Sequence, residues 1–320
     1  MIGQFVEALD QFIPVPAEFA RYEFGLAAGA RILAVDQNLL SAVTAEGMPF
    51  AMDSDEGLLF DHVDLINLAM FGSRSGQSIP ELAMRYFLRF AASPPATWFG
   101  PRDWLVRVRT PATPIGGDPT ARFRMQRPDV AAPGVEILES DAPANGPPGY
   151  QIAVRLTGEE ATVRDPVARA IYEEMLHALG SGAVIYQTVP EALRMDHRRA
   201  WNLRMADCVV VARSLAERLN DVGLRARARR GYLLALVGND HSWCELYEDG
   251  RWKPLDVVFA HLAGIEAYGA RAEFVSTCRG SRFNRLLPCD APDATALVFL
   301  NDQPAPSWAQ VGVSAQPWGS

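Results

Sequence analysis

Apolar residues between Cys208 and Val222 recur at intervals of three and four, which is the spacing of one buried helical face. Asp207 is a residue type that often precedes a helix, and Gly223 is the type that most often follows one. The pattern therefore predicts a helix over residues 208–222, with Cys208 in its first turn. Unpaired backbone amides and the helix dipole stabilise a thiolate at that position.

The segment after this helix has the pattern of strands. Residues 224–237 form a strand-like run in which residues 225–229 alternate in polarity. Residues 238–240 are predicted to form a turn because they read Gly-Asn-Asp. Two further strands are predicted at residues 241–247 and 251–256. The Asp249-Gly250 pair between them is a strong signal for a hairpin with two residues in its turn.

The register of this hairpin decides whether His241, which opens one predicted strand, shares a face with Asp256, which closes the next. If Asp249-Gly250 forms the turn, Glu248 opposes Arg251, and His241 lies diagonal to Asp256 on one face. A four-residue loop would set the pair directly opposite, whereas a three-residue loop without a bulge would separate them. Two of these three turns therefore keep the pair together.

A thiol, an imidazole and a carboxylate arranged in series can generate a thiolate nucleophile. The carboxylate fixes the tautomer of the imidazole, and the imidazole takes the proton of the thiol. Cys208, His241 and Asp256 are therefore a candidate nucleophile, base and orienting acid, provided that the start of the helix approaches the hairpin. The alternative is structural, with Cys208 as a small core residue on an apolar helix face.

The rest of the chain changes character along its length. Helical spacing comes first, at residues 17–35, 61–71 and 79–92. A proline-rich stretch then carries two short strand candidates, at residues 104–109 and 121–126. A further strand is predicted at residues 150–156, and a helix at residues 165–179. We expect a helical and β accessory region at 1–160, a catalytic domain at 161–300 and a tail at 301–320. The two tryptophans of the tail, Trp308 and Trp318, either pin it to the body or leave it poorly ordered.

Composition narrows the class of protein. The chain has 320 residues, 49% of them hydrophobic and 21% charged, as in a globular protein. Its formal net charge of -8 argues against binding to nucleic acid or to an anionic membrane. No apolar run is long enough to span a bilayer, and residues 1–12 lack the pattern of a secretory signal. Four cysteines without a dense framework favour a reducing cytoplasm, and the arginine-rich composition suggests a bacterial source.

Residues 188–258 resemble the transglutaminase-like superfamily. The resemblance rests on the cysteine helix, on the Gly231-Tyr232 pair, and on the run HSWCELYEDGRWKPLD at 241–256. It implies an α+β fold with a papain-like core, in which a helix starting at the catalytic Cys208 packs on an antiparallel sheet that carries His241 and Asp256. The chain departs from many members at Ala206, where they have glycine.

The resemblance also implies a reaction. We expect an acyl-enzyme formed from an amide, a peptide or a carrier-protein thioester and passed to an amine, as in biosynthetic amide formation. A cysteine peptidase or amidase and a non-catalytic binding module are the alternatives. Neither a cofactor nor a metal is expected. By analogy with papain-like sites, the backbone amide of Cys208 and a side chain of Gln187, Trp201 or Asn202 are candidate oxyanion donors. Tyr232 and Trp243 are candidates for contact with the substrate.

Overall fold

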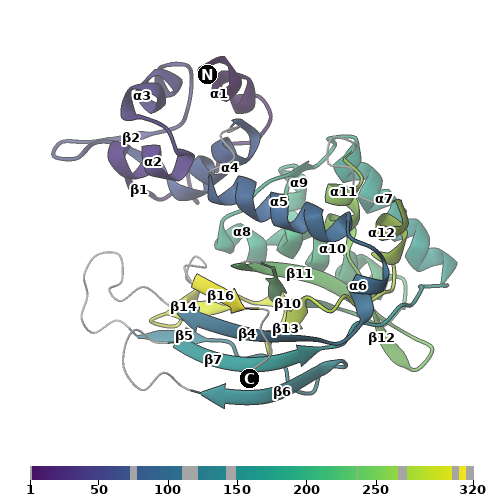
Figure 1. The fold of residues 1–320 in the computed structure, drawn as a ribbon. Helices are drawn as coiled ribbons and strands as arrows, with labels where there is room; N and C mark the ends of the chain where they lie inside the picture. Colours follow the sequence, from purple (N-terminus) through teal and green to yellow (C-terminus); the bar gives the residue numbers. More distant parts are fainter. Residues whose placement is uncertain are drawn as a thin grey trace. The chain divides into compact units, whose positions relative to one another are not determined.

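The computed structural model describes residues 2–72, 78–109, 122–141, 149–235, 237–265, 272–304 and 310–314. Helices and mainly antiparallel sheets together make up the chain, which confirms the α+β class (Figure 1). The chain forms two compact units, each built from two separate stretches of sequence. The first unit contains Met1–Arg85 and Ser181–Asp207, and the second contains Tyr86–Gly180 and Cys208–Ser320.

The first unit consists of short helices and small sheets. Its helices are α1 (Ile2–Leu9), α2 (Leu26–Leu33), α3 (Gln37–Ala45), α4 (His62–Gly72), α8 (Glu191–Met195) and α9 (His197–Asn202). Its strands are β1 (Tyr22–Gly25), β2 (Ala51–Asp53) and β3 (Gly57–Asp61), which form one sheet, and the parallel pair β8 (Ile185–Tyr186) and β9 (Met205–Ala206). Helix α5 (Ile79–Ala91) runs from the first unit into the second.

The helix predicted at residues 17–35 is shorter than expected. Residues 17–19 form a turn, Tyr22–Gly25 form β1, which pairs with β3, and only Leu26–Leu33 is helical. The carboxylate of Asp61 on β3 accepts a hydrogen bond from the backbone N–H of Arg21 at 2.7 Å. Long-range pairing with β3 therefore outweighs the local helical pattern of this segment.

A large sheet organises the second unit. Its strand order is β13-β10-β11-β16-β4-β7-β6, and β12 also pairs with β11. The strands are β4 (Arg102–Arg109), β6 (Val135–Asp141), β7 (Gly149–Leu156), β10 (Ala226–Leu234), β11 (Val237–Glu248), β12 (Arg251–Leu255), β13 (Leu286–Pro288) and β16 (Gln310–Ser314). A smaller sheet contains β5 (Phe123–Met125), β14 (Val298–Leu300) and β15 (Gln303–Pro304).

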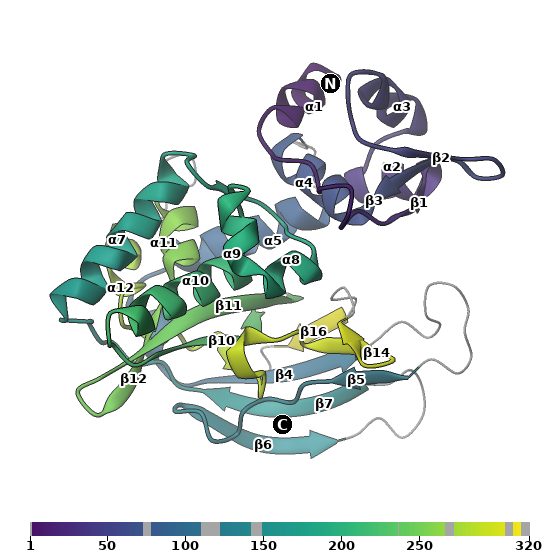
Figure 2. The same ribbon diagram turned by 180° about the vertical axis from the view of Figure 1, so that it is seen from behind.

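Helices cover one side of the β10 and β11 part of this sheet. They are α7 (Pro166–Gly180), α10 (Cys208–Asp221), α11 (Val257–Ala263) and α12 (Ala272–Thr277), and both views show them together there (Figures 1 and 2). The short helices α6 (Ala96–Phe99) and η2 (Pro292–Ala294) complete the unit. Buried residues of β4, β7, β10 and β13 form one continuous apolar cluster with residues near η2.

The two compact units differ from the predicted division at residue 160. Strands β4, β6 and β7 precede that position in sequence, but they belong to the same sheet as β10 and β11. The tail expected at 301–320 contributes β16, which lies between β11 and β4. Trp308 and Trp318, like residue 121 of the strand predicted at 121–126, lie outside the described residues. Pairing between strands that are distant in sequence therefore joins the predicted accessory region and the predicted tail to the sheet of β10 and β11.

Helix α10 and the β11–β12 hairpin follow the prediction closely. The helix begins at Cys208, and it packs against β10 and β11. Glu248 pairs with Arg251, so Asp249 and Gly250 form a two-residue turn, with φ of 53° and 77°. The turn predicted at residues 238–240 is wrong, because these residues belong to β11 and pair with β10. His241 therefore lies inside a strand instead of opening one.

Candidate active site

The imidazole of His241 and the carboxylate of Asp256 form a buried pair. His241 lies on β11, and Asp256 directly follows β12. The Nε2 atom of His241 is 2.7 Å from Oδ2 of Asp256, and the two residues are only 5% and 2% exposed. The two-residue turn thus brings the predicted pair together.

Asp256 is held from several directions. Its second carboxylate oxygen, Oδ1, accepts a hydrogen bond from the backbone N–H of Phe259 at 2.9 Å, so Asp256 is the N-cap of α11. Its own backbone N–H donates to the carbonyl of Cys278 at 2.9 Å, and the hydroxyl of Tyr172 donates to its carbonyl at 3.3 Å. The positive end of α11 stabilises the negative charge of the carboxylate, and these contacts fix its direction.

The thiol of Cys208 meets the same imidazole. Cys208 is the first residue of α10 and is 7% exposed. Burial lowers the pKa of His241, but the charge and hydrogen bond of Asp256, together with the hydrogen bond and charge of Cys208, raise this pKa to about 10. The imidazole accordingly keeps its proton at neutral pH, with a carboxylate on one side and a sulfur on the other.

Aromatic rings enclose His241 as well. The ring of Phe259 stacks on the imidazole, with centroids 4.2 Å apart and planes at 17°. The ring of Trp243 is farther away, at 6.1 Å and 24°. Phe259 was not among the residues predicted for the site. The signal in the sequence is Asp256 itself, because an aspartate before an apolar run often caps a helix and accepts a hydrogen bond from the backbone N–H three residues later, here that of Phe259.

The three oxyanion candidates lie in the first compact unit, whereas Cys208 belongs to the second. Gln187 is fully buried, and its amide pairs with the backbone of Ile13, with Oε1 accepting at 2.9 Å and Nε2 donating at 2.8 Å. Both polar atoms of the buried Gln187 amide are therefore satisfied by the backbone of Ile13, which is a structural role. Trp201 and Asn202 end helix α9. An oxyanion role for these side chains stays a prediction.

The two substrate-contact candidates have different surroundings. Tyr232 on β10 is fully buried within the large apolar cluster, where its side chain packs in the core. A contact between Tyr232 and the substrate stays a prediction. Trp243 is 3% exposed, donates from Nε1 to Glu245 at 3.3 Å, and lines a small pocket. The other residues of that pocket include Pro133, Trp252, Pro254 and Arg282.

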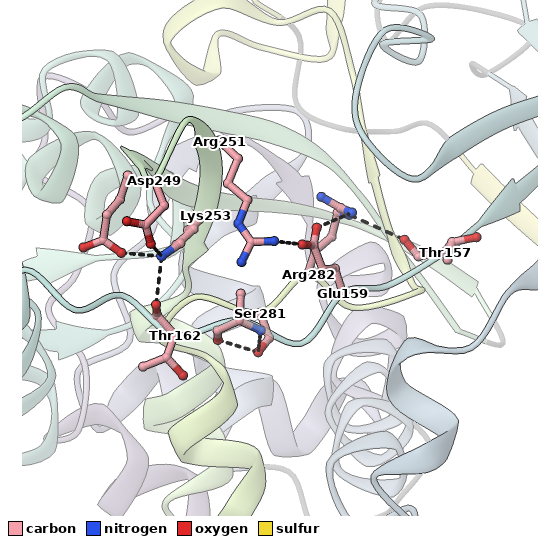
Figure 3. A network of polar contacts seen from close by, with 10 residues as sticks. Thr157, Glu159, Thr162, Asp249, Arg251, Lys253, Ser281 and Arg282 are labelled. Carbon is pink, nitrogen blue, oxygen red and sulfur yellow. Dashed lines mark hydrogen bonds and ion pairs between the residues drawn. The ribbon is translucent and has the colours of Figure 1, made fainter.

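A polar network anchors the hairpin that carries Asp256 (Figure 3). Lys253 on β12 is 2% exposed, and its ammonium donates to the carbonyl of Thr162 at 3.0 Å and to Asp249 at 2.7 Å. It also pairs with Glu248, whose carboxylate accepts from the backbone N–H groups of residues 164 and 165. These bonds tie both strands of the hairpin to the segment before α7.

The same network continues from the turn toward the loop after α12. Arg251 pairs with Glu159, and Glu159 accepts a second hydrogen bond from Arg282 at 3.0 Å (Figure 3). Ser281 donates to the carbonyl of Ala161 at 2.9 Å. The segment before α7 is therefore bonded both to the hairpin and to the loop that precedes β13.

Other features of the described residues bear on the chemistry. No three His, Cys, Asp or Glu side chains among them are grouped in a way that could hold a metal ion. All four cysteines are buried free thiols. None of the helices described is both long and apolar enough to cross a membrane.

Comparisons with known proteins give only weak likenesses. No protein-family model matches the chain, and no curated protein matches its sequence. A crystal structure of a Cytophaga hutchinsonii protein, proposed to be a cysteine protease, aligns over 69% of this chain and 93% of its own, with 11% identity and a TM-score of 0.35. A crystal structure of a TGase aligns over 43% of this chain and 50% of its own, with 14% identity and a TM-score of 0.19. The chemistry of the site therefore has to follow from its own residues.

Proposed function

We propose that this protein is a cysteine-dependent acyl-transfer enzyme with Cys208 as nucleophile, His241 as base and acid, and Asp256 as the group that orients His241. The observation that carries the proposal is the buried carboxylate and imidazole pair, 2.7 Å apart, with the thiol of Cys208 close enough to the same imidazole to raise its pKa. A thiol, an imidazole and a carboxylate linked in series are the parts needed to activate a sulfur nucleophile.

The first half of the reaction forms an acyl-enzyme. Because Asp256 occupies Nε2 of His241, Nδ1 is the ring nitrogen that holds the proton given up by the thiol, and the raised pKa of the imidazole favours this charged form. The thiolate attacks the carbonyl carbon of an amide or thioester, a C–S bond forms, and one electron pair of the carbonyl moves to its oxygen. When this intermediate collapses, the bond to the leaving amine or thiol breaks, and His241 returns the proton to the departing group. The charge of Asp256 stabilises the imidazolium until this proton is returned.

The second half transfers the acyl group to an amine. The amine attacks the thioester of Cys208 while His241 accepts its proton, and the thiolate leaves as the new amide forms. Cys208 and His241 are only 7% and 5% exposed, so an amine and a water molecule alike have to reach a largely covered sulfur. A peptidase or amidase would instead release the acid.

The proposed fold of the site is a papain-like, transglutaminase-like core. Helix α10 starts at Cys208 and packs against β10 and β11, while His241 and Asp256 lie on and beside antiparallel strands. The backbone N–H of Cys208 is the proposed first donor to the oxyanion, and the carrier-protein thioesters of amide-forming pathways are the proposed donors. The chemistry requires no cofactor.

Selective alkylation tests the proposal. Treatment with iodoacetamide at pH 6 to 7, followed by peptide mapping, should modify Cys208 at least tenfold faster than Cys278 or Cys289. Burial raises the pKa of both comparison thiols, so they serve as internal controls. His241→Gln should abolish the difference. Equal rates at all cysteines would refute an activated Cys208 and would favour the non-catalytic alternative.

Product analysis separates transfer from hydrolysis. A small acyl thioester should leave its acyl group on Cys208, detectable as the added mass in the intact protein. Addition of a primary amine should then release an amide, whereas a peptidase or amidase would release the free acid at the same rate with or without the amine. Cys208→Ala should form neither the adduct nor the amide.

A further inference from the structure

Phe259 contacts both partners of the catalytic pair through different parts of the residue. Its backbone N–H donates to Oδ1 of Asp256 at 2.9 Å. Its ring lies against the imidazole of His241, with centroids 4.2 Å apart and planes only 17° from parallel. One residue thus fixes the carboxylate with its main chain and covers the imidazole with its side chain.

The Phe259 ring is itself held in place by other rings. It is 1% exposed, and its centroid lies 4.7 Å from that of Phe87. Phe283 and Phe274 follow at 6.1 and 6.3 Å. A ring packed on several sides in this way cannot turn away from His241 without disturbing the cluster, so it forms a fixed wall beside the imidazole.

The effect of the Phe259 ring depends on the charged and titratable groups around His241. Cys208 meets the imidazole from α10, and Asp256 meets it from the start of α11. Tyr172 of α7 and Cys278 after α12 form hydrogen bonds with the main chain of Asp256. The face of an aromatic ring carries partial negative charge, so it attracts a cation that lies over it. The Phe259 face therefore favours the charged imidazole, and its flat contact limits rotation of that ring.

We infer that Phe259 is a positioning residue that keeps the His241 ring in the plane joining Cys208 to Asp256 and stabilises its protonated form. The inference rests on the proposed function, because it concerns the same thiol and imidazole. Phe259 touches His241 and not the reacting atoms, so it acts through the histidine.

Titration of the histidines by NMR tests the inference. With ¹³C-labelled histidine, the five imidazoles of the chain give few enough signals to follow individually, and His241→Gln identifies its own. Phe259→Leu and Phe259→Met remove the ring but keep the backbone N–H to Asp256. Both should lower the transition of His241 by about one pH unit. Both should also slow alkylation of Cys208 at pH 7 by about tenfold.

Phe274→Leu is the matched control. Phe274 is fully buried in the same aromatic cluster and 6.3 Å from Phe259, so its loss loosens the packing without removing the stacked ring. Its His241 transition should stay at the wild-type value. Thermal unfolding of each variant confirms that the compared proteins are folded.

The outcomes separate the two proposals. If wild-type His241 titrates near the usual value for histidine and Cys208 is not selectively alkylated, the proposed function fails. If the wild type behaves as expected but both Phe259 variants keep its transition, only the positioning role fails. An equal shift in Phe274→Leu also overturns that role, since the effect would then come from general loosening.

Discussion

Gly231 and His241 are direct partners in the antiparallel pairing of β10 with β11. On its other side Gly231 pairs with Pro288 of β13, and a Cβ atom at Gly231 would lie 2.1 Å from the carbonyl oxygen of Leu287. The strand that carries His241 is therefore packed against a position where only glycine fits. The close approach of β13 to Gly231 therefore helps to fix the position of β10, the strand that pairs with His241.

Gly231→Ala should destabilise the fold and disturb the site. The added methyl group would push against backbone atoms of β13, which cannot move aside as a flexible side chain can, and overpacking of this kind costs about 1 to 3 kcal/mol. The free energy of unfolding in urea measures the loss. Gly180→Ala is the control, because a Cβ there meets nothing within 4 Å and should leave stability unchanged or slightly higher. Equal stability of the two variants would contradict the close approach.

Asp256→Asn should reduce acyl transfer by about 10³ to 10⁴-fold. The amide oxygen of the new side chain can still accept from the N–H of Phe259, so the cap on α11 is kept. Its NH₂ group, however, faces Nε2 of His241 and forces the ring proton onto Nδ1, which can then no longer accept the thiol proton. Turnover of a small thioester with an amine acceptor checks this. A loss of less than tenfold in a folded variant would contradict the assigned role of Asp256.

Stability should depend on pH through His241. Its pKa rises from an ordinary 6.5 to about 10 in the folded protein, so the pair contributes fully below pH 6.5. That contribution should decline as pH rises from 6.5 and should be lost above pH 10. The difference in unfolding free energy between wild type and His241→Gln, measured at pH 6, 8 and 10.5, isolates this histidine from other groups. A difference that grows with pH would have the wrong sign.

Lys253→Met should destabilise the hairpin by about 3 kcal/mol. The ammonium is buried and binds Thr162, Glu248 and Asp249, so its removal leaves the mostly buried carboxylate of Glu248 without its cation (Figure 3). Arg251→Met is the comparison, because its guanidinium is half-exposed and such ion pairs contribute less than about 1 kcal/mol. Chemical denaturation of both variants gives the two values. A larger cost at Arg251 would mean that the network is not organised around Lys253.

Much of the site could be predicted because it depends on local chemistry. The Asp249-Gly250 pair adopts the positive φ angles that a two-residue turn needs, which fixes Glu248 opposite Arg251. From that register the shared position of His241 and Asp256 follows by the alternation of strand side chains. The start of α10 at Cys208 follows in the same way from the helical spacing.

The parts that could not be predicted depend on residues distant in sequence. Residues 238–240 have the composition of a turn but extend β11, because pairing with β10 satisfies their backbone. The stacking of Phe259 on His241 has no signature in the sequence, since an apolar residue in a short helix is compatible with any buried surface. The approach of the Cys208 thiol to the imidazole likewise depends on how α10 packs on the sheet. The sequence could not show this approach, so the prediction of the site had to assume it.

The position of β16 has a consequence for the order of assembly during synthesis. Residues 310–314 pair with β4 on one side and with the beginning of β11 on the other, so they bridge strands that the ribosome has made much earlier. Contacts between such distant segments form slowly, because a long loop must close before they are gained. The strand bearing the histidine therefore acquires this neighbour last, and substitutions that weaken it would delay maturation of the newly made chain without altering the reaction of the finished one.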